Sequence, residues 1–307
     1  MDHDKTQFPR RGDSPPTDRV VAIVELLAAE PRGCSVAEVT ERLELSRSTV
    51  TSVLTALEHA GWVRRGPDRS YTLGPGLVGV ADAVRDSLPL SDGVSDVLSA
   101  LADRIGCGVA LSVVQGEQLT FLEVTRGRGR IPAGVAAGTR LPLHAPVGAT
   151  VIAHAEQTRQ DAWLGGAPES QRYALERLLA QIRRTGVAVF QMRETDAHLL
   201  DVLADVVELL AEHPTRTALR ERVFGLIASL SGHPYTTAEL DGDTPLPVSY
   251  LIAPVRDSRG EATYELQIGP LRPAVTKAER DTLVRELLAT VDALGTSMVA
   301  DGGGRRR

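Results

Sequence analysis

Apolar residues recur at helical spacing in two short neighbouring segments, and the pattern predicts a helix-turn-helix near the N-terminus. They stand three, four or seven positions apart, as on one face of an amphipathic helix: Val36, Val39, Leu43, Val50, Val53, Leu54 and Leu57. Ser35 and Ser46 occupy N-cap positions, and Glu38 completes a capping-box spacing with Ser35. Two short helices around a tight turn form the helix-turn-helix motif.

The polar face of the second helix carries small hydroxyl groups and an arginine, where an ordinary solvated helix more often carries Glu and Lys. Hydroxyl groups can bond to phosphates or base edges without bulk, and a helix N-terminus attracts phosphate. The residues expected to probe a DNA major groove are Arg47, Ser48, Thr49, Thr51 and Ser52.

A strand-like pattern follows this second helix. Trp62–Arg65 and Ser70–Leu73 flank a four-residue turn, which predicts a β-hairpin. Its inward side chains are expected to be Trp62, Tyr71 and Leu73, and the arginines expected at the phosphate backbone are Arg64, Arg65 and Arg69. Winged helices also serve as protein-contact modules, but the turn, the hydroxyl-rich helix and the basic hairpin together favour DNA binding.

The rest of the chain alternates helical and strand-like patterns, which predict an α+β domain built on an antiparallel sheet. Hairpins are expected at 109–124 and 248–268 and a short helix at 147–155. The linker helix has an apolar face that could pair with a second subunit. The expected organisation is a disordered tail at 1–17, a winged helix-turn-helix at 18–74, a linker helix at 75–89, an α+β domain at 90–299 with an inserted helical hairpin at about 192–246, and a disordered tail at 300–307. The insertion either extends the core or forms an oligomer or partner surface, since its broad apolar face must be buried.

Several stretches of the chain carry a resemblance to a known family. One is the dense stretch "RVVAIVELLAAEPRGCSVAEVTERLELSRSTVTSVLTALEHAGWVRRGPDRSYTLGPGL". Three shorter ones are "LSALADRIGCGVALSVVQGEQLTFLEV", "GVAAGTRLPLHAPVGA" and "VSYLIAPVRDSRGEATYELQIGP". Together they resemble the IclR-type bacterial transcriptional regulators. The resemblance implies a homodimer or homotetramer whose paired winged helices bind a double-stranded DNA operator. It also implies a GAF-like C-terminal domain that binds a small effector, such as an organic acid.

The resemblance places the effector pocket at the loop after "LPLH" and on a late strand, where small hydroxyl groups often face a carboxylate ligand. The effector-binding residues it implies are His144, Ala145, Gly148, Ala149, Glu265 and Gln267. The late strand presents either Leu266 and Ile268 or, if the register slips by one residue, Glu265 and Gln267, and the sequence does not choose between the two registers. The chain departs from the family at Gly148-Ala149, where the family has Gly-Lys, and one residue is lost. With these departures, the sequence leaves two alternatives to a small organic acid: the site binds a larger and more apolar ligand, or it binds no ligand.

Composition and charge narrow the classes of function. The 307 residues allow two domains, and 42% hydrophobic with 24% charged residues is typical of globular proteins. The net charge of −6 excludes a generally basic nucleic-acid coating protein, but not a binder with a local positive face. No apolar run has bilayer-spanning length and the first residues lack a signal core, so a cytoplasmic protein without membrane contact is expected. Cys34 and Cys107 are expected to be packing residues.

An enzyme is the rival class. The sequence contains no P-loop, no G-x-G-x-x-G after a strand, no G-x-S-x-G and no H-E-x-x-H motif. We therefore expect no catalytic activity, no cofactor and no metal. The expected function is a sequence-specific repressor whose operator affinity is modulated by an effector. The alternative is a DNA-binding protein whose C-terminal domain has lost ligand sensing and serves oligomerisation or partner contacts.

Overall fold

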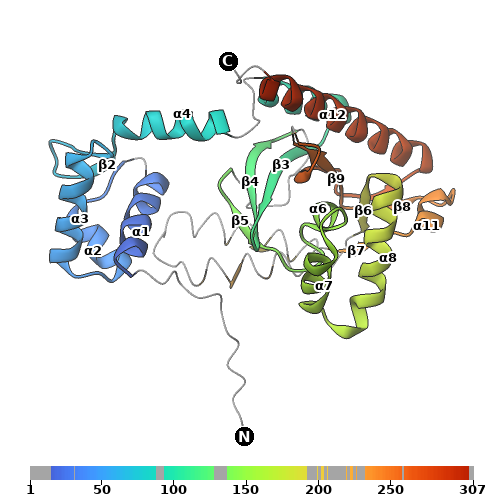
Figure 1. The fold of residues 1–307 in the computed structure, drawn as a ribbon, viewed down its shortest axis with the longest axis horizontal. Coiled ribbons are helices and arrows are strands. Elements are labelled where there is room, and N and C mark those ends of the chain that lie inside the picture. Colours follow the sequence, from blue (N-terminus) through green and yellow to red (C-terminus); the bar gives the residue numbers. More distant parts are fainter. Residues whose placement is uncertain are drawn as a thin grey trace, which may run out of the picture. The chain divides into compact units, whose positions relative to one another are not determined.

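The chain divides into two compact units. In this computed structural model the described residues are 15–30, 32–87, 93–127, 137–191, 232–257 and 259–303, with isolated positions between 199 and 226. The first unit contains Met1–Val84 and Leu209–Thr217, and the second contains Arg85–Glu208 and Ala218–Arg307. Figure 1 shows both units.

The N-terminal unit is the predicted winged helix-turn-helix. Its elements are α1 (Pro15–Ala29), α2 (Val36–Leu43), α3 (Arg47–His59), β1 (Val63–Arg65), β2 (Tyr71–Leu73), the 3-10 turn η1 (Pro75–Leu77) and α4 (Val78–Ser87). The capping box is confirmed, because Ser35 Oγ accepts from the Glu38 amide (3.3 Å) and Glu38 Oε2 accepts from the Ser35 amide (2.7 Å). The apolar faces of α1, α2 and α3 meet in one core with the wing, which also pairs with Cys34 through Tyr71.

The wing differs from the prediction in its inward residues. Paired residues of an antiparallel hairpin share a face, and the pairs here are Val63 with Leu73 and Arg65 with Tyr71. Val63 is buried, whereas Trp62 precedes the strand and packs on the core only in part. The strand therefore begins one residue later than the alternation suggested.

The C-terminal unit is an antiparallel sheet with helices on both faces. Its helices are α5 (Val94–Ile105), α6 (Ala149–Ile152), α7 (Gln157–Gly165), α8 (Glu169–Thr185), α11 (Thr237–Asp241) and α12 (Lys277–Gly303). Its strands are β3 (Gly108–Gln115), β4 (Gln118–Thr125), β5 (Arg140–Pro142), β6 (Ala188–Gln191), β7 (His233–Pro234), β8 (Leu246–Val248), β9 (Tyr250–Arg256), β10 (Ala262–Gly269) and β11 (Arg272–Val275). Both predicted hairpins are confirmed, as β3–β4 and β9–β10.

The larger sheet has the order β5-β4-β3-β10-β9-β6-β7, and β11 pairs with β8 in a second, two-stranded sheet. Helices α5 and α12 cover one face, with Leu98, Leu266 and Leu287 in the shared core. Helices α6, α7 and α8 cover the other face, where the stacked rings of Phe190 and Tyr250 lie 4.7 Å apart. Figure 1 shows α12 and α6–α8 on opposite sides of the strands. The predicted α+β architecture is confirmed.

Some predicted boundaries are corrected. The first helix begins at Pro15, inside the predicted tail, and α12 continues to Gly303, beyond the expected end at 299. The helix expected at 147–155 is only the four-residue α6. Most of the predicted insertion at 192–246 lies outside the described residues, as do 1–14 and 304–307. From residue 232 onward the insertion contains β7, α11 and the start of β8, so it is not helical to its end.

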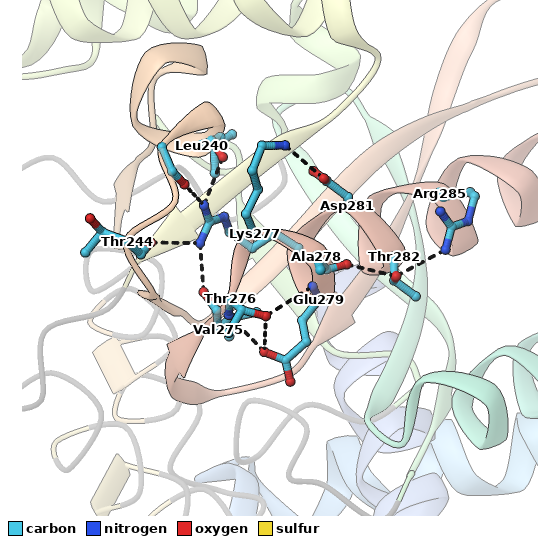
Figure 2. A network of polar contacts seen from close by, with 12 residues as sticks. Leu240, Thr244, Val275, Thr276, Lys277, Ala278, Glu279, Asp281, Thr282 and Arg285 are labelled. Atoms are coloured by element: carbon cyan, nitrogen blue, oxygen red, sulfur yellow. Dashed lines mark hydrogen bonds and ion pairs between the residues drawn. The ribbon is translucent and has the colours of Figure 1, made fainter.

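A buried arginine fixes the start of α12. Arg280 is 3% exposed, and its guanidinium donates to the carbonyl oxygens of Val275 (2.7 Å), Leu240 (3.0 Å) and Thr244 (3.1 Å), and to that of Gly242. Figure 2 shows Leu240, Thr244 and Val275 beside the capping box of the helix, in which Thr276 and Glu279 bond to each other. One side chain thereby ties α11, the loop after it and the end of β11 to α12.

Among the described residues, no helix is long and apolar enough to cross a membrane.

Candidate functional site

The first turn of α3 is held by a network of hydroxyl groups. Ser46 Oγ accepts from the Thr49 amide (3.2 Å) and lies 3.0 Å from Ser48 Oγ and 2.8 Å from Thr49 Oγ1. Thr51 Oγ1 donates to the Arg47 carbonyl (2.8 Å). Three of the five predicted groove residues thus bond within the helix. The side chains of Arg47 and Ser52 are exposed and form no hydrogen bond with a described residue, so both are available to a ligand.

Removing the cap of α3 will destabilise the N-terminal unit. In Ser46→Ala the Thr49 amide loses its acceptor, and we expect the free energy of unfolding to fall by about 1 kcal/mol. Denaturant unfolding of the full chain in a Trp163→Phe background, in which Trp62 is the fluorescent reporter, measures it. Thr55→Ala on the exposed face of the same helix is the matched control and should change stability little. An equal loss in both variants would contradict the capping role.

The three wing arginines differ in how they are held. Arg64 Nε donates to Thr72 Oγ1 across the hairpin (3.1 Å), and the guanidinium of Arg65 lies 5.7 Å from the centre of the Tyr71 ring. Arg69 occupies the turn with a φ of +66°. All three are exposed, and none forms an ion pair with a carboxylate in the part of the chain that the structure describes. Their charges are therefore not neutralised within the fold, as a phosphate-contacting wing requires.

The register of β10 settles which side chains face α6. Leu266 and Ile268 belong to the core under α5 and α12, so Glu265 and Gln267 point to the opposite face. Glu265 is 2% exposed and stands between Ser112 of β3 and Pro254 of β9. The structure therefore selects the slipped register, the one with polar residues at this position.

Glu265 is bound to α6 through one residue. Its Oε1 accepts from the Thr150 amide (3.2 Å) and from Thr150 Oγ1 (2.5 Å). Burial raises the pKa of the Glu265 carboxyl, and these bonds, with a contribution from the Val151 amide, offset part of that rise. Among the described residues no Lys or Arg pairs with it. The carboxyl is thus buried without a cation, and hydrogen bonds alone compensate it.

The loop residues of the predicted effector pocket are only partly brought together. Gly148 and Ala149 are buried next to Thr150, whereas the His144 side chain is exposed and Ala145 is half-buried. Gly148 has a φ of +77°, and a Cβ there would collide with Cδ1 of Leu143. Trp163 Nε1 donates to the Val147 carbonyl (2.9 Å), which fastens the loop to α7. Gln267 lies on the same face of the sheet as Glu265.

Sequence reasoning missed Thr150, the residue that binds Glu265. It directly follows the Gly148-Ala149 pair and is completely buried. A hydroxyl residue at this point of the loop, together with an acidic residue on β10, was the available signal. The sequence could not show that the two residues meet in space, since they are 115 positions apart in the chain.

The pH dependence of stability will reveal the buried carboxyl. Because the pKa of Glu265 is raised in the folded state, the carboxyl stabilises the fold fully below its unfolded value, near 4.5, and this contribution is lost as pH rises through the folded value. Relative to Glu265→Gln, which does not titrate, the wild-type chain should lose free energy of unfolding as pH rises from about 4.5 toward 8. Parallel denaturant titrations of the two proteins across this range measure the difference. A wild-type chain that instead gains stability relative to Glu265→Gln as pH rises would mean that the Thr150 bonds outweigh burial.

The remaining titratable groups supply little further chemistry. Both cysteines are buried, and burial raises the pKa of Cys107 to about 11, which makes its thiol a poor nucleophile. Within the described ranges no three His, Cys, Asp or Glu side chains are placed to hold a metal ion.

Comparison with known proteins agrees with this geometry. A sequence model described as the IclR helix-turn-helix domain matches residues 16–67. The chain is 30% identical over 229 residues to the HTH-type transcriptional regulator Rv1719 of Mycobacterium tuberculosis, covering 70% of this chain and 86% of that protein. It is 28% identical over 182 residues to the regulator XynR of Escherichia coli, covering 56% of this chain and 72% of XynR.

A solved structure is similar over the whole fold. It is an IclR homologue from Microbacterium hydrocarbonoxydans in complex with 4-hydroxybenzoate, with a TM-score of 0.62 and 20% identity, and the match covers 93% of this chain and 99% of that one.

Proposed function

Because this chain belongs to the IclR family of helix-turn-helix transcriptional regulators, we propose that it binds a double-stranded DNA operator through α3 and the β1–β2 wing. Arg47 and Ser52 enter the major groove, with Ser48, Thr49 and Thr51 at its edge. Arg64, Arg65 and Arg69 bind the flanking phosphates. The observation that carries the proposal is the capped α3, which presents free polar side chains next to a wing whose cations are unpaired within the described residues.

The regulator acts as a homodimer or homotetramer in the cytoplasm, without catalytic activity. An operator read by two recognition helices needs two subunits. Helix α4 leaves Val80 and Val84, which stand one turn apart on the same face, exposed at 43% and 50%. These side chains supply an apolar face for the same helix of a second copy.

A small molecule bound between β10 and the 144–149 loop modulates operator affinity, and the protein represses until it binds. The 4-hydroxybenzoate complex of the Microbacterium homologue supports effector binding on this fold. Two observations favour the alternative, a C-terminal unit that serves only oligomerisation: Leu143 packs over Gly148, and His144 points to solvent.

Fluorescence anisotropy against DNA upstream of the chain's own gene and against scrambled DNA, over a salt series, tests the proposal. We expect a preference for the operator of about a thousandfold or more. If binding to the upstream DNA is weak and no stronger than to scrambled DNA, the same measurement is repeated with fragments of the whole genome. The same absence of preference there would contradict the proposal. Operator affinity unchanged by every effector tested would favour the oligomerisation alternative.

A further inference from the structure

Thr150 of α6 directs two hydrogen-bond donors toward the face of β10 that carries Glu265, and both donors are already used within the protein. The Thr150 amide and hydroxyl converge on one point, and the Glu265 carboxyl occupies it. Converging amide and hydroxyl donors with no cation suit a carboxylate. In this chain the side chain of β10 supplies that carboxylate from within the protein.

The surroundings leave little place for a second negative charge. Its cross-strand partners, Ser112 on β3 and Pro254 on β9, and its hydrogen-bond partner on α6, Thr150, carry no titratable side chain of their own. Two carboxylates close together in a buried place repel each other, so one must be protonated or leave. The desolvation that raises the pKa of Glu265 acts equally on an incoming organic acid.

We propose that Glu265 acts as a built-in carboxylate that occupies the anion-binding donors of the effector site, and that the effector of this regulator is therefore an uncharged molecule and not an organic acid. The inference rests on the proposed effector site between β10 and the 144–149 loop. It concerns the chemical class of the ligand and leaves DNA recognition unchanged.

Substitution of Glu265 should reverse the selectivity. Glu265→Ala removes a group the size of acetate and frees the Thr150 donors, whereas Glu265→Gln removes the charge but keeps an oxygen at the donors. We expect Glu265→Ala to bind acetate and 4-hydroxybenzoate at least tenfold more tightly than the wild-type chain does. Glu265→Gln should show no such gain. The uncharged analogues acetamide and 4-hydroxybenzamide should gain little in Glu265→Ala.

The experiment is a set of calorimetric titrations of the full chain at pH 7, with each protein first shown to be folded by circular dichroism and gel filtration. Glu261→Ala, which removes an exposed carboxylate just before the same strand, is the matched control and should bind as the wild type does. Wild-type affinity for either acid equal to that of Glu265→Ala would overturn the proposal, and so would a folded Glu265→Ala that binds neither acid. An equal gain in Glu265→Gln would show that charge alone excludes acids, which contradicts occupancy of the donors.

Operator binding separates this inference from the proposed function. If Glu265→Ala gains acid affinity but no ligand changes the anisotropy of bound operator, the ligand assignment stands and effector control fails. If an organic acid releases the wild-type chain from its operator, effector control stands and the ligand assignment fails.

Discussion

Replacing Arg280 with methionine will lower the free energy of unfolding of the C-terminal unit by about 3–5 kcal/mol. The side chain is 3% exposed, and its guanidinium is the donor to four backbone carbonyl groups from three segments. Methionine fills much of the volume but donates nothing, so the buried carbonyl of Val275 and the three partly buried carbonyl groups lose their partner. Unsatisfied buried acceptors cost about 1–3 kcal/mol each, and partial relaxation toward water reduces the sum.

Equilibrium denaturation followed by circular dichroism measures this loss. Arg285→Met is the matched control on the same helix, because Arg285 is exposed and bonds only to Thr282 among the described residues. The control should stay within about 0.5 kcal/mol of the wild type. Equal stability of Arg280→Met and Arg285→Met would mean that the loop carbonyl groups find water when the guanidinium is removed.

Local sequence signals were sufficient for the N-terminal unit. Caps at Ser35 and Ser46, apolar stripes at helical spacing and a turn between two short strands all act over a few residues. The pattern therefore predicted α2, α3 and the wing. It could not predict that Thr51 and Ser48 bond within the helix, because side-chain rotamers decide this. The choice of Arg47 and Ser52 as the free groups came from the structure.

The C-terminal unit was predictable in class but not in detail. Its hairpins follow from alternation and short turns, but the face that β10 presents depends on a register set by β3 and β9. The pairing of Glu265 with Thr150 and the cluster around Arg280 join segments far apart in the chain. Helices α7 and α8 were not predicted, although α8 buries Leu175, Leu178 and Ile182 at regular spacing. The register of β10 and these two pairings depend on tertiary packing, which periodicity does not encode, whereas the apolar spacing of α8 is a local signal that does indicate a helix.

Ser52→Ala and Arg65→Ala will weaken DNA binding in different ways. Ser52 is exposed on α3 and free of hydrogen bonds to described residues, so its hydroxyl can serve a base edge. Its loss should reduce operator affinity about tenfold and leave affinity for scrambled DNA unchanged. Arg65 lies on the wing over Tyr71, with its charge exposed. Its loss should weaken binding to both DNAs alike and lower the slope of log affinity against log salt by about 0.9.

Arg65→Lys separates charge from the contact with Tyr71. Lysine keeps the phosphate contact and therefore the salt slope, so a slope that falls in Arg65→Lys as much as in Arg65→Ala would assign Arg65 to holding the wing. Anisotropy titrations from about 50 to 200 mM salt resolve these differences. Equal losses on operator and scrambled DNA for Ser52→Ala would remove Ser52 from base recognition. Since the other hydroxyl groups of the helix start are committed to the cap and the backbone, recognition would then rest on Arg47.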